Sequence, residues 1–91
     1  MEIIKIGAMW CPACIITNKF WNNIVDDFKD ISFSNLDIDL DEEEATKYDD
    51  LDILPVIIMK KNDKEISRIV GEHSKEEIEK RIREVLDNEK K

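Results

Sequence analysis

The residues best suited to chemistry in this sequence are its two cysteines, Cys11 and Cys14, which stand three positions apart. A thiol reacts as its thiolate, so a reactive cysteine needs surroundings that favour negative charge. The free amide groups and the positive dipole end of a helix provide such surroundings. We therefore expect Cys11 at the N-cap of a helix, with the amides of Ala13 and Cys14 within reach. In that position Cys11 attacks a substrate disulfide, and Cys14 then resolves the mixed disulfide, leaving a Cys11–Cys14 disulfide.

Two other interpretations of the pair stay open at this point. A C-x-x-C pair can be half of a zinc site, but His73 is the only histidine and no third cysteine exists to complete four ligands. A closed zinc site would need carboxylates or a second chain, and we expect no metal. In the other interpretation the pair is buried and inert, and the domain only binds partners.

The segments around the cysteines predict a strand, a helix and a second strand. Residues 2–8 are apolar and β-branched, which is typical of a short buried strand in a parallel sheet. Pro12 suits the first position of a helix, and apolar residues repeating every four positions extend that helix over 12–29. Residues 32–39 alternate in polarity and predict a strand. The two strands should lie parallel and be joined by a right-handed crossover.

The second half of the chain completes an α/β domain. It predicts a short helix at 42–48, strands at 56–60 and 65–70, and a last helix that opens at Ser74. The element order is β-α-β-α-β-β-α, a mixed four-stranded sheet with helices on both faces. The expected strand order across the sheet is 32–39, 2–8, 56–60, 65–70. We expect residues 1–91 to form a single domain with 87–91 as a frayed tail.

The composition of the chain limits the classes of partner that it can bind and the cellular compartment in which we expect it. The net charge of −8 disfavours nucleic acid and anionic membrane surfaces, because both repel an acidic chain. No basic, apolar leader precedes the first strand, and no apolar run is long enough to span a membrane. We expect a monomer in the cytoplasm, where two cysteines at this spacing are more often catalytic or metal-binding than structural.

Three segments of the chain resemble the thioredoxin-like superfamily: Trp10-Cys11-Pro12-Ala13-Cys14 after a buried strand, Leu54-Pro55 before a strand, and Gly71 ahead of the last helix. The resemblance covers essentially the whole chain, at the size of a minimal thioredoxin or glutaredoxin-like fold. It implies that Pro55 is cis and lies against the cysteines, and that Leu54 offers backbone groups to an extended substrate peptide. The implied substrate-binding residues are Trp10, Pro12, Ala13, Leu54, Pro55 and Gly71.

The chain departs from that resemblance at Lys5. Thioredoxins carry a buried aspartate six positions before the first cysteine, where this chain has lysine. A cation there would favour a thiolate, and a neutral lysine could act as a base. Because a buried lysine is costly without a partner, we expect a carboxylate beside it, Asp37 first and Asp39 next. The alternative is that Lys5 reaches solvent and takes no part in the chemistry.

The resemblance implies a thiol–disulfide oxidoreductase that reduces protein disulfides. Glutaredoxins usually have threonine or another polar residue where this chain has Leu54, and Gly71-Glu72-His73 matches their glutathione-binding motif only in part. We therefore favour a protein-disulfide reductase with no bound cofactor. Its disulfide would be recharged by a flavin-dependent reductase or by glutathione. The alternatives are a glutathione-linked, glutaredoxin-like enzyme and a non-catalytic thioredoxin-like binding module.

Overall fold

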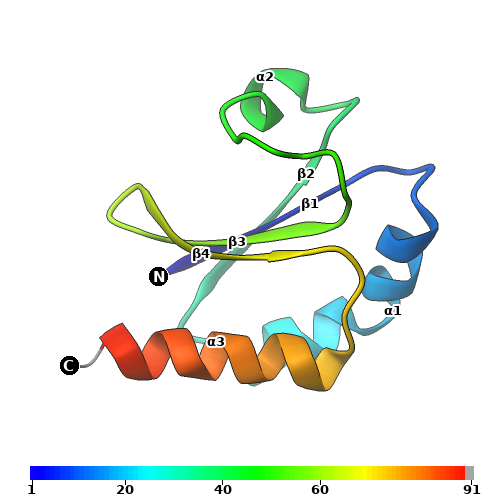
Figure 1. Cartoon of the computed structure of the whole chain (residues 1–91). Coiled ribbons are helices and arrows are strands. Elements are labelled where there is room, and N and C mark those ends of the chain that lie inside the picture. The colour runs from blue at the N-terminus through cyan, green and yellow to red at the C-terminus, as the bar shows by residue number, and fades with distance from the viewer. Residues whose placement is uncertain (90–91) are drawn as a thin grey trace.

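The computed structural model describes residues 1–89, which form a four-stranded sheet and three helices (Figure 1). In chain order the elements are β1 (Glu2–Gly7), α1 (Pro12–Asp27), β2 (Ser32–Asp37), α2 (Glu42–Ala45), β3 (Val56–Lys61), β4 (Lys64–Val70) and α3 (Lys75–Glu89). The predicted order of elements is confirmed.

The sheet runs β2-β1-β3-β4, as the sequence predicts. Strand β1 pairs parallel with β2 and antiparallel with β3, and β3 pairs antiparallel with β4. Strand β1 therefore lies in the interior of the sheet, and its carboxyl end leads directly into the loop that carries the two cysteines.

Side chains that alternate in direction along β1 contribute to two apolar cores, one on each face of the sheet. Ile3 faces α1 and α3, where it packs with Trp21 and other buried residues of the larger core. Ile4 and Ile6 face the opposite side and pack with residues of β3 and the α2 region. Figure 1 shows α1 and α3 on one side of the sheet and α2 on the other, so helices cover both faces as expected. Because side chains alternate along a strand, Lys5 lies on the α1 side.

Local hydrogen bonds explain where several elements begin and end. Strand β2 ends at Asp37, because the Asp37 carboxylate accepts the amides of Asp39 and Leu40, at 2.8 and 3.1 Å, and so turns the chain.

Helix α2 ends at Ala45, earlier than the predicted end at residue 48. The amides of Lys47 and Tyr48 bond to carbonyls three residues back instead of four, so the chain tightens into turns.

Helix α3 begins with the predicted capping box. The amide of Glu77 donates to the Ser74 hydroxyl at 3.1 Å, and the Ser74 amide donates to the Glu77 carboxylate at 3.2 Å. The helix continues to Glu89, past the start of the expected frayed tail at 87, because Val85 and Leu86 anchor its last turns to the core. Residues 90–91 of that tail lie outside the described residues.

No helix within residues 1–89 combines the length and the apolar character that crossing a membrane requires.

Candidate active site

The two cysteines lie where β1 gives way to α1. Cys11 is the N-cap of α1 and has extended backbone angles, with φ −90° and ψ 113°. Its sulfur accepts the backbone amide of Cys14 at 3.2 Å, which confirms the expected N-cap position. Both residues are free thiols, and both are buried, with 5% of Cys11 and 4% of Cys14 exposed. The helix N-terminus thus supplies a hydrogen-bond donor to the Cys11 sulfur, which favours its thiolate.

The chain before β3 lies against the pair. The Leu54–Pro55 peptide bond is cis, and the Cys11 thiol donates to the Leu54 carbonyl at 3.7 Å. Gly71 is tied to the same segment, because its amide donates to the Pro55 carbonyl at 2.9 Å. Gly71 has φ +86°, a conformation that glycine adopts readily. The segment before β3 therefore lies against the cysteines on one side and is bonded to the end of β4 through Pro55 and Gly71.

The surface beside Cys11 is apolar and exposed. Trp10 is 65% exposed, and its indole nitrogen donates to the Asp39 carboxylate at 2.8 Å. Ile53 is 61% exposed and neighbours Leu54, and Met9 is exposed beside Trp10. Sequence reasoning missed Met9, Ile53 and the role of Asp39. The adjacency of two apolar side chains to the motif segments was the available signal.

Gly7 is a second residue that sequence reasoning missed. A Cβ atom at Gly7 would lie 3.0 Å from the Cys14 sulfur, closer than such contacts normally occur. The absence of a side chain therefore lets the sulfur approach the strand. A glycine inside an otherwise β-branched strand was the signal, because it often marks such a close approach.

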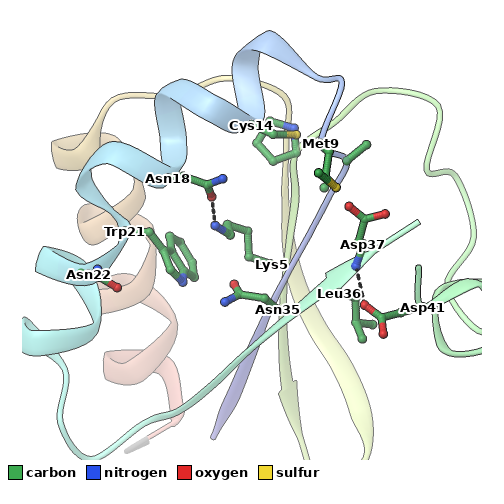
Figure 2. Close-up of a pocket in the computed structure, with 13 residues that line it drawn as sticks. Lys5, Met9, Cys14, Asn18, Trp21, Asn22, Asn35, Leu36, Asp37 and Asp41 are labelled. Carbon is green, nitrogen blue, oxygen red and sulfur yellow. Dashed lines mark hydrogen bonds between the residues drawn. The ribbon is translucent and has the colours of Figure 1, made fainter. Parts of the chain in front are cut away.

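A cavity of about 390 Å³ opens beside Cys14 (Figure 2). Its lining includes Lys5, Cys14, Asn18, Trp21 and Asp37. Burial raises the pKa of the Cys14 thiol to about 11, and its hydrogen bond with Cys11 acts in the same direction. Burial also lowers the pKa of Lys5, and the nearby Cys14 thiolate opposes that shift.

The expectation of a carboxylate partner for Lys5 is wrong. The Lys5 amine donates to the amide oxygen of Asn18, and it lies 5.1 Å from the ring centroid of Trp21. Asp37 accepts backbone amides in the turn after β2, and Asp39 accepts the Trp10 indole. The Lys5 side chain extends toward α1, so the polar group it meets comes from that helix.

Within residues 1–89, no group of three or more His, Cys, Asp or Glu side chains is placed to hold a metal ion. His73 lies at the start of α3, with its ring nitrogens near the Val70 carbonyl at 3.1 Å and the Glu77 carboxylate at 3.4 Å.

A mixed four-stranded sheet that carries a dithiol at the N-terminus of a helix, next to a cis-proline segment, defines the thioredoxin-like class of folds. The Thioredoxin family model matches residues 1–84. The chain belongs to the thioredoxin family, whose members are thiol–disulfide oxidoreductases.

Relatives and solved structures agree with this assignment. Thioredoxin H2 of Arabidopsis thaliana is 30% identical over 80 residues, which cover 88% of this chain and 59% of that protein. Thioredoxin of Gallus gallus is 26% identical over 86 residues, which cover 94% of this chain and 80% of that protein. The chain thus spans about three fifths of the plant protein's length.

Two solved structures share the fold. A poplar thioredoxin h superposes with a TM-score of 0.84 at 19% identity, covering 94% of this chain and 76% of that one. Thioredoxin 1 of Thermosipho africanus superposes with a TM-score of 0.78 at 23% identity and covers all of both chains.

Proposed function

We propose that this protein reduces protein disulfides by dithiol exchange through Cys11 and Cys14. One observation carries the proposal: the Cys11 sulfur sits at the N-terminus of α1, accepts the Cys14 amide at 3.2 Å and lies beside the Leu54 carbonyl. A hydrogen-bond donor and a helix dipole both favour the anionic form of this sulfur. An anionic sulfur at the edge of a peptide-binding segment is the arrangement that disulfide attack requires.

The first step forms a mixed disulfide. The Cys11 thiolate attacks one sulfur of the substrate disulfide, a Cys11–substrate bond forms, and the other substrate sulfur leaves as a thiolate and takes a proton. The amide of Cys14 stabilises the attacking charge before the bond forms. The donor is part of the helix backbone, so little reorganisation is needed to place it.

The second step releases the substrate. Cys14 loses its proton and attacks the Cys11 sulfur, the Cys11–substrate bond breaks, and the second substrate sulfur leaves and is protonated. Two electrons and two protons have then passed to the substrate, and a Cys11–Cys14 disulfide remains. The residues stand one helical turn apart, and the Cys14 amide already contacts the Cys11 sulfur. The two thiols also share a hydrogen bond, so little movement is needed to join the two sulfurs.

We assign substrate binding to the surface around Cys11. An extended peptide can pair with the backbone of Leu54, and Pro55 holds that segment against the cysteines. Apolar substrate groups would contact the exposed Trp10, and the backbone of Gly71 borders the same surface. The remaining assigned residues are Pro12 and Ala13, in the turn between the two cysteines.

Recharging completes the cycle. The protein needs no bound cofactor in this proposal, because the electrons are carried by the two cysteines themselves. A flavin-dependent reductase, or alternatively glutathione, would reduce the Cys11–Cys14 disulfide by the same exchange in reverse.

Reduction of insulin by dithiothreitol, followed as turbidity, tests the proposal. The protein should accelerate it well above dithiothreitol alone, and Cys11→Ser should abolish the acceleration. Cys14→Ser should instead trap a mixed disulfide with the substrate, visible by mass spectrometry without added reductant. A wild-type protein that gives no acceleration would contradict the proposal.

The insulin assay separates the alternatives when an enzymatic reducing system replaces dithiothreitol. Turnover supported by glutathione and glutathione reductase alone, and not by a thioredoxin reductase, would indicate a glutaredoxin-like enzyme. Absence of both activities, with Cys11→Ser leaving partner binding intact, would indicate a binding module.

A further inference from the structure

A lysine is buried behind the resolving cysteine. Lys5 is 9% exposed, and it lines the same cavity as Cys14. Figure 2 shows the Lys5 side chain running toward Asn18 and α1, with Trp21 beside it. A buried cation is costly, so a lysine in this place needs groups that stabilise its charge.

The surroundings of Lys5 hold it as a cation. The amide oxygen of Asn18 accepts a hydrogen bond from the amine. The Trp21 ring lies 5.1 Å away, within the range of a cation–π interaction. Neither partner is charged, so neither neutralises the ammonium.

The charge of Lys5 is therefore available to other groups in the cavity. Besides Lys5, the titratable side chains that line the cavity within residues 1–89 are Cys14, Asp37 and Asp41. One carboxylate oxygen of Asp37 accepts the amides of Asp39 and Leu40. A carboxylate oxygen of Asp41 accepts the Asp37 amide at 2.9 Å. Both carboxylates thus contribute to the turn after β2.

The Cys14 thiol needs such a charge. Its pKa is raised to about 11, first by burial and then by the hydrogen bond with Cys11. Lys5 acts in the opposite direction and favours the Cys14 thiolate. The hydrogen bond with the Ala8 backbone also favours the thiolate, and within residues 1–89 Lys5 is the only cation that shifts the pKa of Cys14.

We propose that the Lys5 ammonium stabilises the Cys14 thiolate during the resolving step. This role explains why a buried lysine lines the cavity beside Cys14. The inference rests on the proposed dithiol exchange and assigns a charge to its second step. Lys5 acts through Cys14, and it is therefore a positioning residue rather than a catalytic one.

The step balances without a further reactant. The Cys14 proton leaves through the cavity to solvent, and the thiolate attacks the Cys11 sulfur. The Cys11–Cys14 bond forms, and the bond to the substrate sulfur breaks. The substrate sulfur leaves as a thiolate and takes a proton from solvent. Lys5 keeps its proton throughout, and its charge favours the anion that attacks.

A limiting amount of 5,5′-dithiobis(2-nitrobenzoate) separates the two steps of the reduced protein. Attack by Cys11 releases one coloured thiolate, and the resolving attack by Cys14 releases the second in a phase that does not depend on protein concentration. Both rates are measured between about pH 6 and about pH 12, so that the interval includes the Cys14 pKa of about 11. The variants are Lys5→Met, Lys5→Gln and Lys5→Arg.

Lys5→Gln supplements Lys5→Met because glutamine can still donate to Asn18 while losing the charge. Lys60→Met is the matched control. Lys60 also lies over an aromatic ring, 5.4 Å from the Tyr48 centroid, and its loss changes the net charge equally. It pairs in register with Glu2, at the end of β1 away from the cysteines.

Loss of the Lys5 charge should raise the midpoint of the second phase, the pH at which its rate is half-maximal, by about one unit. The second phase should slow about threefold at neutral pH, because greater intrinsic nucleophilicity offsets part of the smaller thiolate fraction. The first phase should change less than about twofold in the same variants, since Lys5 acts on the second step. Lys5→Arg and Lys60→Met should keep the wild-type midpoint.

Equal midpoints for wild type, Lys5→Met and Lys5→Gln would overturn the role of Lys5. Failure of the proposed function looks different, because wild-type protein would then give no acceleration of insulin reduction, whatever the midpoints of the second phase.

Discussion

The backbone amide of Cys14 donates to the sulfur of Cys11 at 3.2 Å, so the thiol at the N-cap of α1 has a hydrogen-bond donor from its own helix. Cys11 gains a donor that favours its anion. Burial raises the pKa of Cys14 to about 11 and outweighs the hydrogen bond between its sulfur and the Ala8 backbone, which lowers that pKa. The nucleophile and the resolving residue are thus distinguished by their positions along one helical turn.

The first prediction concerns alkylation of the reduced protein. Iodoacetamide at neutral pH should label Cys11 well before Cys14, because only about one Cys14 in ten thousand is a thiolate when its pKa is about four units above the pH. Partial labelling followed by peptide mass spectrometry gives the order. Equal labelling, or labelling of Cys14 first, would rule out the proposed asymmetry.

A second prediction follows from the close approach of β1 to Cys14. Gly7→Ala should destabilise the protein by about 1–3 kcal/mol, because its Cβ would crowd the Cys14 sulfur at 3.0 Å. Urea unfolding measures the change. In a Cys14→Ala background the same substitution should cost clearly less, since the crowded sulfur is gone. An equal cost in both backgrounds would show that the strain lies elsewhere.

The third prediction concerns the bond between Trp10 and Asp39. Asp39→Ala removes the acceptor of the indole and should raise the KM for a protein disulfide while changing kcat little, because the exposed ring loses its fixed orientation. Asp39→Asn keeps an oxygen acceptor and should behave close to wild type. Steady-state insulin reduction provides both constants. A fall in kcat alone would contradict this account.

The fourth prediction concerns Gly71. Gly71→Ala should lower the free energy of unfolding by about 1 kcal/mol, because φ is +86° and alanine tolerates that region poorly. Contact is not the reason, since an added Cβ would meet Ile53 at an ordinary 3.5 Å. Gly71→Asn should cost less, because asparagine enters positive φ more readily. Urea unfolding of both variants checks the order.

The fifth prediction concerns acid stability at the start of α3. The Ser74 backbone amide, together with His73, holds the pKa of Glu77 below its usual 4.5. A carboxyl whose folded pKa is depressed stabilises the fold above its unfolded pKa, and this contribution is lost as the pH falls through the folded value. Wild type should therefore lose more stability below about pH 4.5 than Glu77→Gln does. If the urea midpoints of wild type and Glu77→Gln fell by the same amount as the pH is lowered through that range, the assignment would be contradicted.

Local patterns in the sequence predicted most of the fold. The β-branched run of β1, Pro12 at the start of α1 and the Ser74–Glu77 capping box each depend on neighbours within one or two turns. Such signals survive in a single sequence because their partners are close along the chain. The position of Cys11 at the helix N-cap was predictable for the same reason.

The residues that the sequence alone misplaced depend on contacts between distant segments. The partner of Lys5 is Asn18, not Asp37, because the lysine side chain extends toward α1 rather than along the sheet. Helix α2 is shorter than its pattern predicts because the chain tightens after Ala45.

By itself, then, the sequence determined the element order, the sheet order and the N-cap position of the reactive thiol, because these follow from periodicity, capping and handed crossovers. Only the tertiary structure decided what surrounds the cysteines. It brings Gly7 against the Cys14 sulfur and the Leu54 carbonyl against Cys11, and it turns Lys5 toward Asn18. Those contacts join segments up to 43 positions apart, and no local pattern encodes the direction in which a buried side chain finds its partner.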